Sequence, residues 1–223
     1  MPAKTVNTAL TIAGSDSSGG AGIQADIKTF AAHQVFGTSV ITSVTSQNSL
    51  GVRSVFDLPV NVVEQQLLAV FSDRKPCAVK TGMLGNESIV ECVSLHIKRN
   101  KIKNLVVDPV ILSSSGQPLL TPKGVDALKS TLLPLAFLVT PNLYEAGVLS
   151  GVTITRPSDR IKAARALMKT GVKNVLIKGG HAKGRPEDYL YDGKREYLLT
   201  AERVTSKDMH GTGCVLSSAI ASG

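Results

Sequence analysis

The chain of 223 residues carries 25 lysines and arginines against 17 aspartates and glutamates, giving a formal net charge of +8, and 43% of its residues are hydrophobic. These values are typical of a globular protein with a substantial core and exclude an intrinsically disordered chain. Only 4% of the residues are aromatic, which argues against a nucleic-acid partner bound by base stacking, whereas the basic excess suits a small anion such as a nucleotide phosphate.

Short apolar runs alternate with amphipathic windows along most of the chain. The apolar runs predict buried strands at 9–14, 39–47, 53–58, 77–83, 104–110, 136–142 and 172–180. The amphipathic windows predict helices at 21–35, 60–73, 87–99, 122–133 and 157–171. This alternation predicts an α/β protein with a mostly parallel sheet and helices on both faces. Near the end, Asp192-Gly193 separates two strand-like runs, which predicts an antiparallel hairpin at one edge.

No repeat, low-complexity tract or linker interrupts the sequence pattern, so we expect residues 1–223 to form a single domain. The longest apolar run, 132–139, is too short to cross a bilayer, and the first residues lack the features of a secretory signal. We therefore expect a soluble cytoplasmic protein with no membrane partner.

The three cysteines form neither a CxxC pair nor a zinc-ligand spacing. Cys77 adjoins a strand-like run and Cys92 lies in a helical window, so both are expected to be small core residues. Cys214 differs because it follows a glycine turn.

Most residues that could bind a ligand or take part in catalysis follow the predicted strands, and this is where parallel α/β sheets bind their ligands. The first such segment, "GSDSSGGAGIQAD" (14–26), has glycines that let a backbone approach a ligand closely. It matches neither G-x-G-x-x-G nor G-x-x-x-x-G-K-[ST], which disfavours a nicotinamide cofactor and a P-loop. A flexible turn explains the segment about as well. Asp26 is either a charge that stabilises the helix dipole or a ligand contact.

The segment "HGTGCVLSSAI" (210–220) is more specific. Its glycines allow consecutive N–H groups to face one concavity at a helix N-terminus, where a transferring phosphoryl group would be stabilised. Cys214 at this helix start is expected to have a lowered pKa, so that its thiolate can accept a proton from a substrate hydroxyl. The alternative is a capped helix with a buried cysteine.

Three further residues are candidates for holding a nucleotide and its metal. Asn142 and Glu145 can present oxygen atoms together on a short helix, and oxygen ligands suit Mg²⁺. Without the other motifs, an N-cap and a surface glutamate explain them better. Lys178 either neutralises a phosphate or is a solvated strand end.

Taken together, seven segments resemble a known family. In the order "TIAGSDSSGGAGIQADIKTF", "VTSQNSLGV", "KTGML", "VVDPV", "LVTPNLYEA", "LIKGGH" and "HGTGC" they are similar to the hydroxymethylpyrimidine/phosphomethylpyrimidine kinases of the ribokinase-like superfamily. The resemblance covers nearly the whole chain. It implies a three-layer α/β/α sandwich, ATP and Mg²⁺ as cofactors, and a homodimer. The implied reaction phosphorylates 4-amino-5-hydroxymethyl-2-methylpyrimidine and then its monophosphate, in thiamine biosynthesis.

The resemblance also implies roles for individual residues. Cys214 corresponds to the catalytic base. The other implied sites are an anion hole at Gly211, Thr212 and Gly213, a pyrimidine site at Gly14, Asp26, Gln47 and Met83, and a nucleotide and Mg²⁺-phosphate region at Asp108, Asn142, Glu145 and Lys178, with the metal near Asp108 and Glu145.

The sequence departs from the family at two points. Met209 stands where threonine is common. Family members also usually continue for several dozen residues beyond HGTGC, through further helices, whereas this sequence ends at Gly223, in the helix expected to follow the motif. Two alternatives stay open: a pyridoxal or pyridoxine kinase of the same subfamily, because pyridoxal also carries a hydroxymethyl group on its ring, and a non-catalytic pyrimidine-binding relative.

Overall fold

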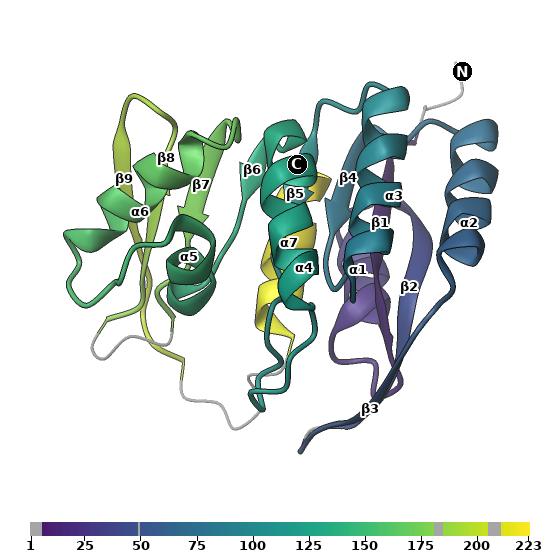
Figure 1. The fold of residues 1–223 in the computed structure, drawn as a ribbon, viewed down its shortest axis with the longest axis horizontal. Helices are drawn as coiled ribbons and strands as arrows, with labels where there is room; N and C mark the ends of the chain where they lie inside the picture. Colours follow the sequence, from purple (N-terminus) through teal and green to yellow (C-terminus); the bar gives the residue numbers. More distant parts are fainter. Residues whose placement is uncertain (1–5, 49, 181–184, 205–210) are drawn as a thin grey trace.

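The structure is a computed structural model that describes residues 6–48, 50–180, 185–204 and 211–223. One sheet of nine strands runs through it in the order β3-β2-β1-β4-β5-β6-β7-β8-β9 (Figure 1). The strands are β1 (Thr8–Asp16), β2 (Phe36–Asn48), β3 (Gly51–Asp57), β4 (Ala78–Thr81), β5 (Leu105–Val107), β6 (Leu138–Val139), β7 (Asn174–Ile177), β8 (Glu187–Tyr191) and β9 (Glu196–Thr200).

The six central strands, from β2 to β7 in space, pair in parallel. The predicted hairpin is confirmed: β8 and β9 are antiparallel, and Asp192 accepts hydrogen bonds from the Lys194 and Arg195 amides in the turn. A second antiparallel edge, β3 on β2, was not predicted. Its direction follows from the connection, since the two residues between β2 and β3 are too few for a parallel crossover.

Among the residues that the structure describes, seven α-helices cover the two faces of the sheet. On one face, α1 (Gly22–Ala32) and α7 (Thr212–Ser222) pack against each other. The opposite face carries α2 (Val60–Asp73), α3 (Glu87–Arg99), α4 (Pro122–Ala127), α5 (Leu143–Ser150) and α6 (Asp159–Met168), which lie in front of the sheet in Figure 1, with α7 behind it. The three-layer α/β/α sandwich is therefore confirmed.

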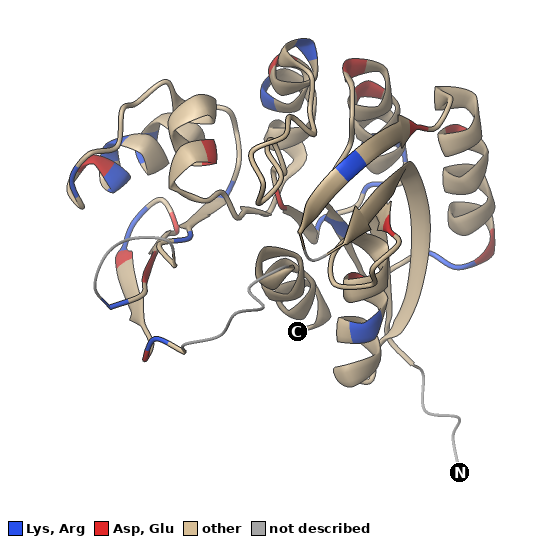
Figure 2. Ribbon diagram, turned by 90° about the horizontal axis from the view of Figure 1, so that it is seen from below, with Lys and Arg blue, Asp and Glu red and all other residues tan. Residues whose placement is uncertain are grey.

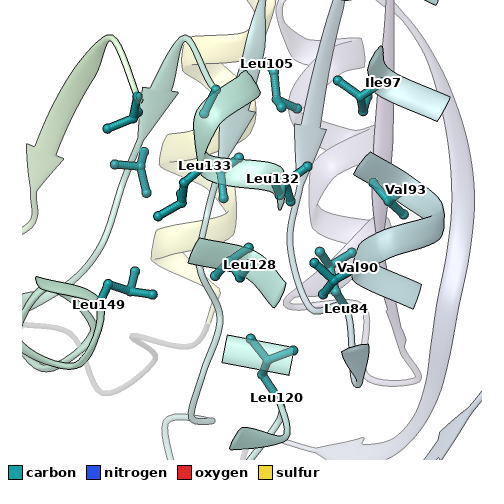
Figure 3. Packing of buried hydrophobic residues seen from close by; sticks show 14 of the residues in the cluster. Leu84, Val90, Val93, Ile97, Leu105, Leu120, Leu128, Leu132, Leu133 and Leu149 are labelled. Atoms are coloured by element: carbon teal, nitrogen blue, oxygen red, sulfur yellow. The ribbon is translucent and has the colours of Figure 1, made fainter. Parts of the chain in front are cut away.

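The helix predicted at 122–133 changes its geometry along its length. After α4, the chain passes through a π-helical turn at Leu128–Leu132 and a 3₁₀ turn at Leu133–Leu135. Proline within the last turn cannot continue an α-helical hydrogen-bond ladder. The leucines of this segment still face inward, and Figure 3 shows them beside the side chains of α3 in the larger core.

Two cores lie on the two sides of the sheet. The larger one fills the space between the sheet and the helices α2 to α6, and the smaller one joins Phe30, Val106, Leu138, Leu176 and Ala221 beneath α1 and α7. Burial of these side chains is the main favourable term in holding the layers together. The smaller core places α7 over the middle of the sheet.

Cys77 and Cys92 were both expected to be core residues, and the structure supports this for Cys92. Cys92 is half-buried and packs against the larger core. Cys77, expected in the core, is exposed. It stands just before β4, in which Ala78 is half-buried and the fully buried residues begin only at Val79.

Candidate active site

The candidate functional side chains gather at the end of the sheet where the parallel strands finish. Figure 2 looks at this end, and the first turn of α7 lies near its centre. The segments that meet here follow β1, β4, β5, β6 and β7, as expected for a doubly wound sheet. Two strands run further than expected: β1 continues two residues beyond Gly14 and β2 one residue beyond Gln47.

Asp16, which the sequence patterns leave unmarked, organises the glycine-rich turn after β1. Its buried carboxylate accepts hydrogen bonds from the backbone N–H groups of Ser18, Gly20 and Ala21 at 2.8, 3.2 and 2.8 Å. It also accepts one from the Ser18 hydroxyl. An aspartate that bonds to amides two residues and more ahead is a recognised turn signal, and this signal would have identified Asp16.

Close backbone packing joins this turn to the start of α7. Gly211 has a φ of 80°, and a Cβ atom there would overlap the carbonyl oxygen of Gly20. Gly22 has a φ of 57°, and a Cβ atom there would overlap the carbonyl oxygen of Gly14. Only glycine combines such a conformation with such an approach. Two segments almost 200 residues apart are thus brought into direct contact.

Cys214 lies in the first turn of α7 and is half-buried. Its thiol pKa was expected to be lowered, and this prediction is wrong. Burial raises the pKa of the Cys214 thiol, the positive charge of Lys80 opposes that effect, and the charges of Asp108 and Asp26 add to it. A hydrogen bond with the Gly22 amide also favours the thiolate, but less strongly. The thiol is therefore protonated at neutral pH, because loss of solvation outweighs the nearby cation.

Asp108 and Lys178 form an ion pair beside this turn. Lys178 Nζ lies 2.8 Å from Asp108 Oδ1, and the Ser217 hydroxyl of α7 lies 3.3 Å from Asp108 Oδ2. Burial alone would raise the pKa of Asp108, but the cations of Lys178 and Lys80 outweigh it and lower the pKa. A Cβ atom on Gly213 would lie 3.1 Å from Lys178 Nζ. The amine of Lys178 therefore lies directly against the predicted anion hole.

Asn142 and Glu145 form the capping box of α5. The Asn142 side chain accepts a hydrogen bond from the Glu145 amide, and the Glu145 carboxylate accepts one from the Asn142 amide, both at 2.8 Å. Glu145 is only 4% exposed, so it is not a surface glutamate. Burial, followed by the charge of Asp108, raises the pKa of Glu145 to about 7. The two neighbouring carboxylates thus concentrate negative charge.

Asp26 lies beneath α7 and is completely buried. Its carboxylate oxygens lie 2.9 and 2.8 Å from Lys80 Nζ, and Lys80 is also fully buried. The hydroxyls of Thr11 and Ser218 donate to the same carboxylate at 2.6 and 2.7 Å. Asp26 is therefore part of an internal network in which each of its oxygens has two partners.

The other predicted pyrimidine contacts lie on the β1–β2 side of this end. A Cβ atom on Gly14 would lie 3.1 Å from Met83 Sδ, so these two residues are neighbours. The Gln47 side-chain oxygen accepts a hydrogen bond from Thr45 at 3.1 Å, and the Gln47 backbone exchanges hydrogen bonds with Ser17 of the glycine-rich turn. Gln47 is thereby fixed next to the turn.

Met209 and His210 lie outside the described residues.

Within the part of the chain that the structure describes, no group of three or more His, Cys, Asp or Glu residues could hold a metal ion. None of the described helices is both long and apolar enough to span a membrane.

Comparison with known proteins identifies the family. The sequence model described as phosphomethylpyrimidine kinase matches residues 16–223. The chain belongs to the phosphomethylpyrimidine kinase family. A hydroxymethylpyrimidine/phosphomethylpyrimidine kinase of Bacillus subtilis is 47% identical over 221 residues, which cover 97% of this chain and 80% of the relative.

Solved structures of related kinases share the same arrangement. A phosphomethylpyrimidine kinase from Clostridium difficile superposes with a TM-score of 0.86 at 42% identity, covering 97% of this chain and 89% of that one. A pyridoxal kinase from Staphylococcus aureus, solved in complex with AMP-PCP and pyridoxal, gives a TM-score of 0.89 at 37% identity over 98% of this chain and 80% of that one. The fold is thus shared with a pyridoxal kinase that binds AMP-PCP and pyridoxal.

Proposed function

We propose that this protein transfers the γ-phosphoryl group of ATP to the hydroxymethyl group of 4-amino-5-hydroxymethyl-2-methylpyrimidine. A second transfer, to the resulting monophosphate, would yield the diphosphate used in thiamine biosynthesis. The observation that carries this proposal is the convergence of the glycine-rich turn, the Asp108–Lys178 pair and the start of α7 in a chain of this family. Residues 1–223 would act as one kinase domain in the cytoplasm.

The reaction needs a nucleophile, a stabilised phosphoryl group and a leaving group. The substrate hydroxyl oxygen forms a bond to the γ-phosphorus while the bond from that phosphorus to the bridging oxygen of ADP breaks. Backbone N–H groups of Gly211, Thr212 and Gly213 would stabilise the charge on the transferring group, and Lys178 lies against them. Cys214 would take the hydroxyl proton.

The raised pKa of Cys214 adds a requirement to its proposed role as the base. A neutral thiol cannot accept a proton, so the thiol must first lose its own, and the fixed cation of Lys80 favours that loss. Once formed, a thiolate of raised pKa is a stronger base than one of low pKa. Most of the rate enhancement would then come from positioning and charge stabilisation.

Mg²⁺ would be held near Asp108 and Glu145. The donor set fits this ion, since two carboxylates lie close enough together for Asp108 to raise the pKa of Glu145. Mg²⁺ needs no cage of protein ligands, because it keeps water and substrate phosphates in its shell. When bound, it would neutralise charge on the phosphates. Asn142 caps the helix that carries Glu145 and so orients that carboxylate.

The pyrimidine would bind beside the glycine-rich turn. Gln47 can both donate to and accept from an aminopyrimidine edge, and Gly14 and Met83 would lie against the ring. Asp26 would support this pocket from beneath, through its buried ion pair with Lys80.

Product analysis tests the proposal directly. The protein is incubated with the pyrimidine alcohol, ATP and MgCl₂, and the products are identified by mass spectrometry. The mono- and diphosphates are expected. If the pyrimidine binds but no ATP is consumed, the protein is a non-catalytic relative and the proposal is wrong.

Pyridoxal kinase activity is the second candidate. It is favoured by the structural likeness to the Staphylococcus aureus pyridoxal kinase, whose TM-score of 0.89 is as high as that of the pyrimidine kinase structure. Steady-state kcat/KM values for the two alcohols, measured side by side, decide between them.

We further propose a homodimer formed through the β2–β3 edge. Val44 and Phe56 are opposite each other in the register of this pair, and they are 45% and 63% exposed. A second copy would cover this apolar pair. Light scattering is expected to show a dimer that Phe56→Glu converts to a monomer.

A further inference from the structure

Two buried ion pairs lie under the first turns of α7, and each is bonded to the helix by a different serine. Ser218 donates to Asp26 Oδ1 at 2.7 Å, and Asp26 is paired with Lys80. The Ser217 hydroxyl lies 3.3 Å from Asp108 Oδ2, and Asp108 is paired with Lys178. It also lies 3.0 and 3.1 Å from the Gly213 and Cys214 carbonyl oxygens, so its one proton is shared between its own helix and the ion pair. The two serines are completely buried. Adjacent residues on one helix therefore reach two separate charge pairs. One is formed by Asp26 of α1 and Lys80 of β4, and the other by residues that directly follow β5 and β7.

These contacts fix α7 in two respects. A helix can slide along its axis or rotate about it. A single hydrogen bond to the groups beneath the helix does not prevent both motions. Ser217 and Ser218 are about 100° apart around the helix, so bonds from both resist rotation as well as sliding. Cys214 stands one turn before Ser218, on the same side of the helix. Fixing the two serines thus fixes Cys214 and the N–H groups before it.

The network also accounts for the choice of serine. A buried carboxylate is stabilised by hydrogen-bond donors, and Asp26 receives one bond from Thr11 and one from Ser218 in addition to those from Lys80. Alanines at 217 and 218 would have no hydroxyl to donate. They would leave both carboxylates with one partner fewer and α7 held by packing alone.

We propose that Ser217 and Ser218 are positioning residues that hold the first turn of α7 in register with the two ion pairs. They touch neither substrate nor nucleotide, and they act through the placement of Cys214 and the anion hole. The kinetic part of this inference rests on the proposed kinase function.

The test compares Ser217→Ala and Ser218→Ala with two matched controls. Ser222→Ala removes a hydroxyl of the same helix that bonds only within the helix, to the Ser218 carbonyl. Thr11→Val removes a hydrogen bond to the same Asp26 carboxylate but from β1, so the bond that is lost does not involve α7. Testing the two serines separately keeps the inference testable if one variant does not fold.

Both serine variants are expected to lower kcat by about tenfold or more, with the KM for ATP and for the pyrimidine within about twofold of wild type. Thr11→Val is expected to lower the melting temperature as much as Ser218→Ala but to keep kcat within about twofold of wild type. Equal kcat losses in Thr11→Val and Ser218→Ala, or unchanged kcat in both serine variants, would overturn the proposal, because the serines would then act on stability alone.

A second readout does not depend on kinase activity. The rate of iodoacetamide alkylation at Cys214 is followed against pH by peptide mass spectrometry, with exposed Cys77 as the internal reference thiol. In both serine variants the midpoint is expected to shift to higher pH, since Lys80 and the Gly22 amide are no longer held against the thiol. An inactive wild-type protein would overturn the proposed function, and the alkylation midpoints alone would then decide this inference. Midpoints equal to that of Ser222→Ala would overturn it.

Discussion

Cys214 shows how two opposing effects act on one side chain. A helix N-terminus, the Gly22 amide and the cation of Lys80 all favour the thiolate, while burial and two carboxylates favour the thiol, and burial dominates. The residue type and its place in the motif are visible in the sequence. The sign of its pKa shift is not, because desolvation depends on what α1 and β4 place around the thiol.

Replacing Cys214 tests its role as the base. Cys214→Ala is expected to lower kcat by about a hundredfold or more, since a positioned base contributes at least that much. Cys77→Ala removes an exposed thiol outside the site and serves as the control, with unchanged turnover. Steady-state kinetics with saturating pyrimidine and ATP measure both. Turnover close to wild type in Cys214→Ala would contradict the assignment.

Gly211 offers a second test at this scale. Its φ of 80° is unfavourable for alanine, and an alanine Cβ would also overlap the Gly20 carbonyl oxygen. Gly116 has a similar φ of 83° but nothing within 4 Å of its Cβ position, so Gly116→Ala carries the backbone strain alone.

We expect Gly116→Ala to cost about 1 kcal/mol of unfolding free energy with kcat unchanged. Gly211→Ala is expected to cost more and to lower kcat by about tenfold or more, because the anion hole must move away from the glycine-rich turn. Urea denaturation and turnover are the measurements. The same result for both alanine variants would show that the close approach to Gly20 is unimportant.

At the scale of elements, α6 illustrates how a carboxylate fixes a helix start. Asp159 accepts hydrogen bonds from the amides of Arg156 and Thr155 at 3.0 and 3.2 Å, and Lys162 lies 3.2 Å from its other oxygen. The Arg156 amide, then Lys162 and the Thr155 amide, lower the pKa of Asp159 to about 2. The folded pKa is therefore below the value of about 3.9 in an unfolded chain.

A carboxylate of lowered pKa stabilises the fold above its unfolded pKa, and this stabilisation is lost as the pH falls toward 2. Asp159→Asn, a neutral mimic of the protonated acid, should lower the melting temperature by a few degrees at pH 7 and by almost nothing near pH 2. Asp126→Asn, on the exposed side of α4, is the control and should have no effect at either pH. A difference that persists undiminished at low pH would contradict the role of the charge.

At the scale of the whole molecule, the candidate site is assembled from the parallel strands, from β2 to β7 in space, and from α7. The residues that would meet the triphosphate come from the ends of β5, β6 and β7 and from α7, and those proposed for the pyrimidine come from β1, β2 and the segment after β4. Parallel pairing brings all of these ends to one edge. The two groups are joined where the glycine-rich turn packs on α7.

Metal removal tests this assembly as a unit. EDTA is expected to abolish phosphoryl transfer, and excess MgCl₂ to restore it, because the triphosphate charge needs a cation that Lys178 alone cannot replace. Pyrimidine affinity, measured by calorimetry without nucleotide, should be unaffected, since its proposed contacts lie on the β1–β2 side. Turnover that continues in EDTA would contradict the Mg²⁺ assignment.

The sequence by itself determined the element order, the parallel sheet, the β8–β9 hairpin and the family, because apolar periodicity, turn residues and ordered motifs are local features. It also marked the segments that meet in the site. It did not reveal that Asp16 organises the first turn. It also did not reveal that β3 is antiparallel to β2, although the short connection between these strands indicates it.

Only the tertiary structure decided how the charged residues are used. Asp26 and Lys80 lie 54 positions apart in the sequence, and Asp108 and Lys178 lie 70 apart, so no local pattern pairs them. Their burial, the raised pKa of Cys214 and the two serine contacts all depend on where α7 lies relative to the sheet. Charge interactions and desolvation act through space, and the packing of distant segments sets those distances.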